Sequence, residues 1–174
     1  MKKILAFGAS NSQNSINKKF ALYAASLFND ATVDVLDLND YEMPIYSIDR
    51  EKSTGIPELA QQFFDKIQSS DITIISFAEH NGAYTTTFKN IFDWVSRINN
   101  KFLDTKQMLL LSTSPGPRGG ATVLQMATDR LPRHGANIKA SFSLPSFNDN
   151  FDDGDGITNL ELKNKLTEII SENF

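Results

Sequence analysis

Short apolar segments alternate with longer amphipathic segments along the chain. Each apolar segment has the length and composition of a strand. One of them, Ile72–Phe77, is almost wholly apolar, which is typical of a strand buried on both faces of a sheet. The strands predicted in this way are Lys3–Phe7, Thr32–Leu38, Ile72–Phe77, Gln107–Ser112 and one within Asn137–Leu144.

The amphipathic segments carry apolar residues at helical spacing, so each predicts a helix. The second begins near Pro57, where the missing N–H of proline costs nothing. The apolar stripes are Ile16, Phe20, Tyr23, Ala24 and Leu27; Leu59, Phe63 and Ile67; Phe88, Ile91, Phe92, Val95 and Ile98 between Thr86 and Lys101; Val123, Leu124, Ala127 and Leu131 between Gly120 and Arg133; and Leu162, Leu166, Ile169 and Ile170 between Asn159 and Ser171.

Five strands alternating with five helices predict an α/β protein with a parallel sheet between two helical layers. Right-handed crossovers then give a doubly wound five-stranded sheet in the flavodoxin-like order 2-1-3-4-5, a three-layer α/β/α arrangement. The 174 residues suffice for one domain with a substantial core, and neither a repeat nor a linker is visible. We therefore expect residues 1–174 to form a single domain.

Composition narrows the possible partners and compartment. The net charge is −4, the sequence pI is about 5.1 and there is no basic cluster, so neither nucleic acid nor an anionic membrane is an expected partner. No cysteine is present, which suits a reducing compartment. The apolar stretch Ile4–Phe7 is too short for a signal peptide, and no run approaches the roughly 18 apolar residues of a membrane span. We expect a cytoplasmic protein.

An acidic segment near the C-terminus, residues 145–158, raises the question of calcium binding. No register of this segment places Asp or Asn at loop positions 1, 3 and 5 together with Gly at 6 and Glu at 12. A solvated loop is the better interpretation, and no metal site is expected.

The first predicted strand leads into a loop of small polar residues, residues 8–17, with the sequence GASNSQNSIN (the first loop). Hydroxyl, amide and backbone N–H groups at a helix N-terminus favour a phosphate group. The glycines and lysine of a triphosphate loop or a dinucleotide fingerprint are absent, so a single terminal phosphate fits best. The alternative is that Ser15 only caps the helix.

The loops after the third and fourth strands are expected at the same sheet edge as the first loop, because ligands bind beyond the carboxyl ends of parallel strands. The second loop, residues 78–90, contains Asn81-Gly82, a pair that tolerates positive φ. The third loop, residues 112–120, contains Ser114-Pro115-Gly116 and Gly119-Gly120. A planar ring could lie between these two loops, although glycines that only end strands would give the same pattern.

Three ordered motifs resemble the NADPH-dependent FMN reductase family, which includes flavodoxin-fold quinone, chromate and azo reductases. The resemblance covers nearly the whole chain. It rests on Ser10-x-Ser12-x-x-Ser15-x-Asn17, on Glu79-His80-Asn81 followed by Phe88-Lys89-Asn90-Ile91-Phe92-Asp93-Trp94, and on Ser112-Thr113-Ser114-Pro115-Gly116 with Gly119-Gly120.

The resemblance implies an FMN site in the three loops. In this family the first loop holds the FMN phosphate, and the second and third loops lie along the isoalloxazine ring. The candidate FMN-binding residues are Ser10, Ser12, Ser15, Ile16, Asn17, Glu79, His80, Asn81, Gly82, Ser114, Pro115, Gly116 and Gly119. NADPH or NADH is the expected transient co-substrate, and a homodimer or tetramer is the expected assembly.

Two residues depart from the family pattern, which usually has Arg in place of Ser12 and Tyr in place of His80. A charge-assisted hydrogen bond contributes about 1.5–3 kcal/mol, so the loss of the guanidinium predicts weaker flavin binding. The change at His80 leaves open the substrate range. A contact of Arg118 with the extra phosphate of NADPH is possible, but a solvated loop arginine is the favoured interpretation. Likewise, a stacking or surface role is favoured for His80 over proton donation to a quinone.

The expected activity is hydride transfer from NAD(P)H through FMN to a small acceptor such as a quinone or free flavin. FMN carries the chemistry, so no side chain is expected to be catalytic. Trp94 lies about 100° off the apolar stripe of its helix, which predicts a position outside the core and a subunit interface.

Two other functions remain open: a flavodoxin-like electron carrier without a nicotinamide site, and a scaffold that has lost flavin. A receiver domain fits poorly, because residues 8–17 contain no acidic side chain and the third strand is not followed by an aspartate that could be phosphorylated.

Overall fold

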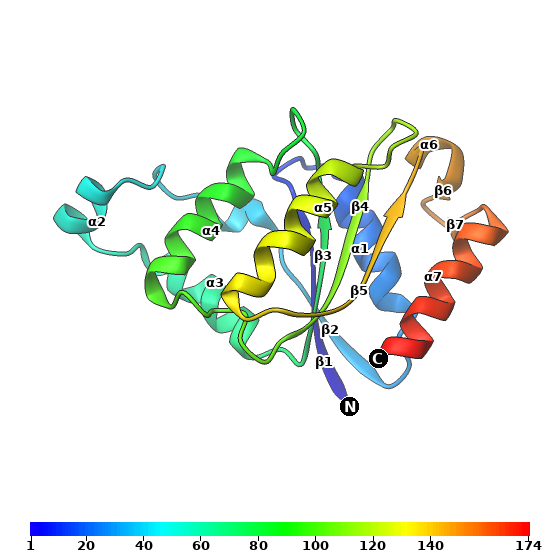
Figure 1. Ribbon diagram of the computed structural model, residues 1–174, viewed down its shortest axis with the longest axis horizontal. Helices are drawn as coiled ribbons and strands as arrows, with labels where there is room; N and C mark the ends of the chain where they lie inside the picture. Colours follow the sequence, from blue (N-terminus) through cyan, green and yellow to red (C-terminus); the bar gives the residue numbers. More distant parts are fainter.

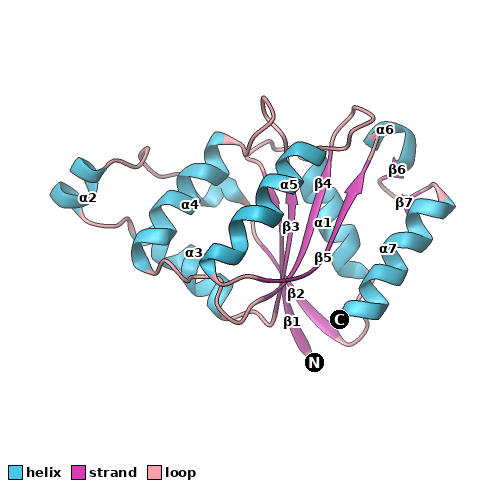
Figure 2. Cartoon of the chain, viewed as in Figure 1, coloured by secondary structure: helices cyan, strands magenta, loops and turns pink.

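The computed structural model describes residues 1–174 and contains a five-stranded parallel sheet in the order β2-β1-β3-β4-β5. Figures 1 and 2 show helices on both faces of this sheet. The predicted fold class and strand order are confirmed. The strands are β1 (Lys2–Ala9), β2 (Ala31–Val35), β3 (Ile72–Phe77), β4 (Gln107–Thr113) and β5 (Asn137–Leu144).

The helices that cover the sheet differ in composition between its two faces. One face packs against α3 (Glu58–Gln68), α4 (Thr86–Ile98) and α5 (Ala121–Arg130), and its core is rich in phenylalanine. The other face packs against α1 (Ile16–Ser26) and α7 (Leu160–Asn173). There α1 presents alanines, which let the helix lie close to the sheet.

Central strands are more buried than edge strands in this sheet, because helices cover both faces of its centre. All six residues of β3 are buried, which confirms the prediction from its apolar sequence. By contrast, β2 is an edge strand with four exposed residues.

Several helix and strand ends differ from the predicted boundaries. The strand β2 ends at Val35, because Asp37 caps a short 3₁₀ helix, η1 (Leu38–Tyr41). The helix α5 ends at Arg130 and is followed by the 3₁₀ helix η2 (Leu131–His134), since Pro132 lacks the N–H of a continued α-helix. The helix α4 ends at Ile98, three residues before the predicted end.

Two segments predicted as loops contain regular structure. Residues 44–57, here called the arm, include the helix α2 (Ile48–Thr54), which has no buried residue and lies away from the body in Figure 1. The acidic segment forms the short helix α6 (Phe147–Asn150) and a two-stranded hairpin of β6 (Phe151–Asp152) and β7 (Gly156–Ile157). No helix in the structure has both the length and the apolar character that a membrane crossing requires.

The predicted outward position of Trp94 is wrong, because its side chain is only 1% exposed. Its indole Nε1 donates to the carbonyl of Pro44 at 2.7 Å, and its ring packs edge-on against Tyr46. The arm therefore covers the side of α4 that lies off the apolar stripe. A buried tryptophan needs such a partner for its N–H, and sequence periodicity does not reveal it.

Candidate functional site

A pocket of about 210 Å³ opens at the carboxyl ends of β1, β3 and β4, where residues of all three loops meet. Of the predicted residues, the pocket brings together Ser10, Ser12, Ser15, Ile16, Asn17, Glu79, His80, Ser114 and Pro115. The other predicted residues, Asn81, Gly82, Gly116 and Gly119, are not part of its lining. The lining also includes three residues that sequence reasoning missed, Asn14, Ala78 and Thr113, each directly beside a predicted one.

The first loop presents free hydrogen-bond donors to this pocket. Ser15 caps α1, since its hydroxyl accepts the N–H of Lys18 at 3.1 Å, and the hydroxyl of Ser10 accepts the N–H of Ser12 at 3.1 Å. The N–H groups of Ile16 and Asn17 have no partner in the chain. Ser15 is thus a cap, as the alternative interpretation held, and the cap still leaves two donors at the positive end of the helix. This donor set suits a phosphate group.

Asn17 fixes the floor of the pocket. Its side-chain Oδ1 accepts the hydroxyl of Ser76 at 2.7 Å and the N–H of Thr113 at 3.0 Å, while its Nδ2 donates to the carbonyl of Thr113 at 3.1 Å. Asn17 is only 3% exposed. The amide therefore joins the start of α1 to the ends of β3 and β4, and only the backbone N–H of Asn17 remains for a ligand.

A glycine at the end of β1 brings α1 close to the sheet. A Cβ atom on Gly8 would lie 2.4 Å from the backbone nitrogen of Lys18 and 2.9 Å from the carbonyl carbon of Asn17. No side chain fits this approach, because real Cβ contacts are longer. The position of the free N–H groups thus depends on a glycine just before the first polar residues.

The second loop makes a tight turn at Asn81 and Gly82. Both residues have positive φ, 53° and 74°, and His80 and Ala83 exchange two backbone hydrogen bonds of 3.0 and 3.1 Å across the turn. Asn-Gly pairs are favoured where two consecutive residues need positive φ. The base of the loop is tied to β1, because the hydroxyl of Thr85 donates to the carbonyl of Ala9 at 2.9 Å.

Glu79 connects the second loop to the third. Its carboxylate accepts the N–H of Val123 at 2.9 Å, in the first turn of α5. The N-cap of α5, Gly120, has no side chain to fill this role. Glu79 was predicted to lie along a flavin ring; the structure places it in the pocket lining and also gives its carboxylate a fixed partner that sets the distance between the two loops.

Gly119 has a packing role in the third loop. It has φ of 56°, and a Cβ atom there would lie 2.5 Å from the hydroxyl of Ser143 and 2.7 Å from the carbonyl of Leu144. The loop therefore lies directly on the end of β5. The carbonyl of Gly119 accepts hydrogen bonds from the hydroxyls of Ser112 at 2.7 Å and Ser143 at 3.0 Å, so the base of the third loop is rigid.

The pocket has no lysine or arginine in its lining. Lys18 lies nearby on α1, but its ammonium group binds the carboxylate of Asp37. Burial alone would raise the pKa of Asp37, but the hydrogen bonds from Lys18 and Asn39 outweigh it and hold the pKa below its ordinary value. Lys18 is therefore engaged, and a phosphate in the pocket would be held by neutral donors and the helix dipole.

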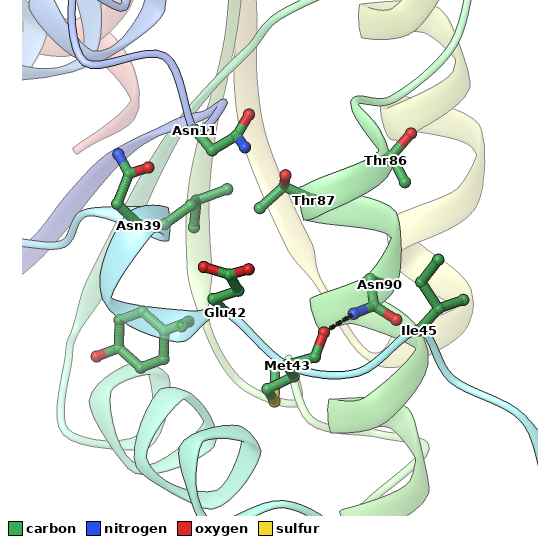
Figure 3. A pocket seen from close by; sticks show the side chains of 10 residues that line it. Asn11, Asn39, Glu42, Met43, Ile45, Thr86, Thr87 and Asn90 are labelled. Atoms are coloured by element: carbon green, nitrogen blue, oxygen red, sulfur yellow. Dashed lines mark hydrogen bonds between the residues drawn. The ribbon is translucent and has the colours of Figure 1, made fainter. Parts of the chain in front are cut away.

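A second pocket, of about 240 Å³, borders the first loop at Asn11 (Figure 3). Its side chains come from the segment after β2 and from the start of α4, and they include Glu42, Thr86 and Thr87. Asn90 on α4 donates to the carbonyl of Met43 at 3.0 Å, the dashed line in Figure 3. Sequence reasoning did not find this pocket, because nothing in the segment after β2 indicates a turn back towards α4.

Comparison with known proteins supports the assignment of the fold and family. The model of the NADPH-dependent FMN reductase family matches residues 2–149. A protein of Mycoplasma pneumoniae without an assigned function is 31% identical over 156 residues, which are 87% of this chain and 92% of that protein. A quinone reductase of Escherichia coli is 30% identical over 80 residues, which are 46% of this chain but only 43% of the reductase.

The solved structure of FerB, a flavoenzyme NAD(P)H:(acceptor) oxidoreductase from Paracoccus denitrificans, has a TM-score of 0.78. It is 22% identical, and the alignment covers 99% of this chain and 94% of FerB. At this identity the similarity shows the shared flavodoxin-like fold. Together with the family match, the shared fold shows that this chain belongs to the NADPH-dependent FMN reductase family, a family of oxidoreductases that use NADPH and act with FMN.

Proposed function

We propose that the pocket at the first loop binds FMN and that the chain transfers hydride from NAD(P)H through FMN to a small acceptor such as a quinone. The observation that carries this proposal is the pair of free N–H groups of Ile16 and Asn17, which open into the same pocket as both glycine-containing loops. A pocket of about 210 Å³ is smaller than a typical ligand site of about 300–1,000 Å³. It suits the phosphate end of the cofactor, with the ring on the open side between the second and third loops.

Each loop has a distinct task in this proposal. The hydroxyl of Ser12 and the N–H groups of Ile16 and Asn17 hold the phosphate. The turn at Asn81 and Gly82 and the backbone at Ser114 to Gly116 line the ring and offer donors for charge that develops on it. Bound FMN would supply the hydride chemistry. Glu79 keeps the two ring-lining loops at a fixed spacing through its bond to α5.

A homodimer is the proposed assembly, and the arm supports it. Ile45 and Ile48 in the arm are 68% and 49% exposed, and Ile56 at its end is also exposed. The arm is nevertheless held in place by Asn90 and Trp94 of α4. Apolar side chains on a fixed projection suit an interface between subunits. Size-exclusion chromatography with light scattering tests this, and a monomer at micromolar concentration would contradict it.

Two alternatives predict different results in one assay. An electron carrier would bind FMN but show negligible NADPH oxidation with a quinone, whereas a scaffold would bind no FMN. The visible absorption spectrum of the purified protein, before and after addition of FMN, separates the scaffold from the other two. Turnover of NADPH with FMN and a quinone separates the carrier from the reductase.

The substitution Ser15→Asp tests the phosphate position. Aspartate caps a helix as well as serine does, so α1 remains intact, but the added carboxylate repels a phosphate at Ile16 and Asn17. We expect FMN retention to be abolished. The matched control is Ser47→Asp, since Ser47 caps α2 in the same way, accepting the N–H of Arg50 at 3.2 Å, far from the pocket. Equal flavin content in both variants, measured by absorbance near 450 nm, would reject the pocket.

A further inference from the structure

Arg118 lies at the gap between the second and third loops. It is an exposed residue of the third loop, and its guanidinium Nη2 donates to the hydroxyl of Thr122 at 2.9 Å. Thr122 in turn faces the second loop, because a Cβ atom on Gly82 would lie 4.0 Å from its methyl group. The bond to Thr122 therefore holds the guanidinium on the side of α5 that faces the turn of the second loop.

Arg118 binds a hydroxyl and has no carboxylate partner. By contrast, the basic side chains of α1 and α4, two other helices that begin at this edge, all bind carboxylates. These pairs are Lys18 with Asp37, Lys19 with Asp153, Lys89 with Asp93 and Arg97 with Glu51. Because the pocket lining itself has no cation and Lys89 of the second loop binds Asp93, Arg118 is the positive charge of the three loops that is left for an anionic ligand.

The start of α5 beside Arg118 adds few free donors. The N–H of Ala121 is bound to the carbonyl of Arg118 at 3.0 Å, and the N–H of Val123 is bound to Glu79. The carboxylate of Glu79 also disfavours an anion on the inner side of this helix end. At the start of α5 an anion is therefore favoured beside the guanidinium of Arg118 and not beside the carboxylate of Glu79. Its binding depends on the charge of Arg118.

We propose that Arg118 binds the 2′-phosphate of NADPH and thereby favours NADPH over NADH; this inference rests on the proposed function. The two nucleotides differ only in this group, a terminal phosphate with close to two negative charges, and guanidinium groups bind such phosphates through paired hydrogen bonds. In this proposal the nicotinamide lies against the flavin ring, and the adenosine end extends away from it along the rim where Arg118 is exposed. Arg118 is thus a specificity-determining residue, and the flavin phosphate at the first loop does not depend on it.

The test is binding of NADP⁺ and NAD⁺ to the FMN-loaded protein by isothermal titration calorimetry. We expect Arg118→Gln to weaken NADP⁺ binding about tenfold and NAD⁺ binding less than twofold. Arg118→Lys should recover part of the loss, because it keeps the charge but not the paired geometry. The preference should also decrease with added salt, since Arg118 is exposed.

The matched control is Arg130→Gln, which removes the same charge from the other end of α5, also at an exposed position. It should leave both affinities unchanged. Equal losses for NADP⁺ and NAD⁺ in Arg118→Gln, or no loss for either, would overturn the inference. If the wild-type protein takes up FMN but binds the two nucleotides equally, this inference is wrong and the proposed function stands. If the protein does not take up FMN, the proposed function is wrong as well.

Discussion

Two asparagines, Asn17 and Asn90, organise two different regions of this molecule by the same chemistry. Each lies near the start of a helix and uses both ends of its amide to bind the backbone of another segment. Asn17 binds both backbone groups of Thr113 under the candidate pocket. Asn90 accepts the N–H of Tyr46 at 2.8 Å and donates to the carbonyls of Met43 and Pro44, which fixes the base of the arm.

The two regions differ in what surrounds the amide. Asn17 is buried, and its partners Ser76 and Thr113 are almost completely inaccessible to water. Asn90 is only partly buried, and the arm that it holds ends in an exposed helix. A lost hydrogen bond costs most where water cannot replace it. We infer that the pocket floor is coupled to the stability of the whole fold, whereas the arm is held locally and can be released without unfolding.

The largest effect is expected for Asn17→Ala. This change leaves the hydroxyl of Ser76 and both backbone groups of Thr113 buried without partners, at a cost of about 3 kcal/mol in the free energy of unfolding. Because α1 loses its link to the ends of β3 and β4, FMN binding should be lost together with stability. Urea denaturation and flavin titration measure the two effects.

The control for this prediction is Asn14→Ala in the same loop. The side chain of Asn14 is exposed and makes no hydrogen bond within the chain, so the free energy of unfolding of this variant should differ from that of the wild type by less than about 0.5 kcal/mol. If Asn17→Ala is as stable as Asn14→Ala, the amide does not hold the pocket floor.

Much of the fold and pocket could be predicted from the sequence because local patterns determine them. The apolar strands gave the sheet order, and the three loops at one sheet edge supplied nine residues of the pocket. The link between Asn17 and Thr113 joins residues 96 positions apart, so no local pattern indicates it. The same holds for Glu79, whose partner Val123 lies 44 residues away.

The arm shows most clearly where sequence reasoning fails. Helical periodicity placed Trp94 outside the core, and it does lie off the apolar stripe of α4. The covering segment comes from residues 44–46, some 50 positions earlier, and carries no apolar repeat that predicts this contact. Periodicity reports which side of a helix faces its own sheet, and it is silent about segments that return to cover another side.

A smaller effect is expected for Asn90→Ala. Asn90 is only partly buried, and the carbonyl of Pro44 keeps its hydrogen bond from Trp94, so the free energy of unfolding should fall by only about 1 kcal/mol. The arm should open locally, with faster hydrogen exchange at the amide of Tyr46 and faster proteolysis within residues 44–57. FMN binding should persist in this variant.

The control is Lys89→Ala on the same helix, which removes an exposed ion pair with Asp93. It should leave proteolysis of the arm unchanged. A global destabilisation of Asn90→Ala as large as that of Asn17→Ala would contradict the distinction between a pocket floor coupled to the fold and a locally held arm.

The smallest effect concerns a third buried polar side chain, His134, which is not fully paired as the two asparagines are. Its Nδ1 lies 2.8 Å from the carbonyl of Asn100, while its Nε2 is buried without a partner. The ring packs against Phe92 and Phe102. Nδ1 must carry the proton to donate to this carbonyl, so a second proton could go only to the enclosed Nε2.

Burial lowers the pKa of His134, and the positive charges of Arg130 and Lys101 lower it further, against the opposing hydrogen bond to Asn100. Below about pH 6.5 the unfolded chain takes up a proton that the folded chain resists, so stability is full at neutral pH and falls on acidification. His134→Phe should therefore flatten the loss of stability between about pH 7 and 5 in urea denaturation. An unchanged slope in His134→Phe would mean that the enclosed nitrogen takes up its proton as readily as one in water.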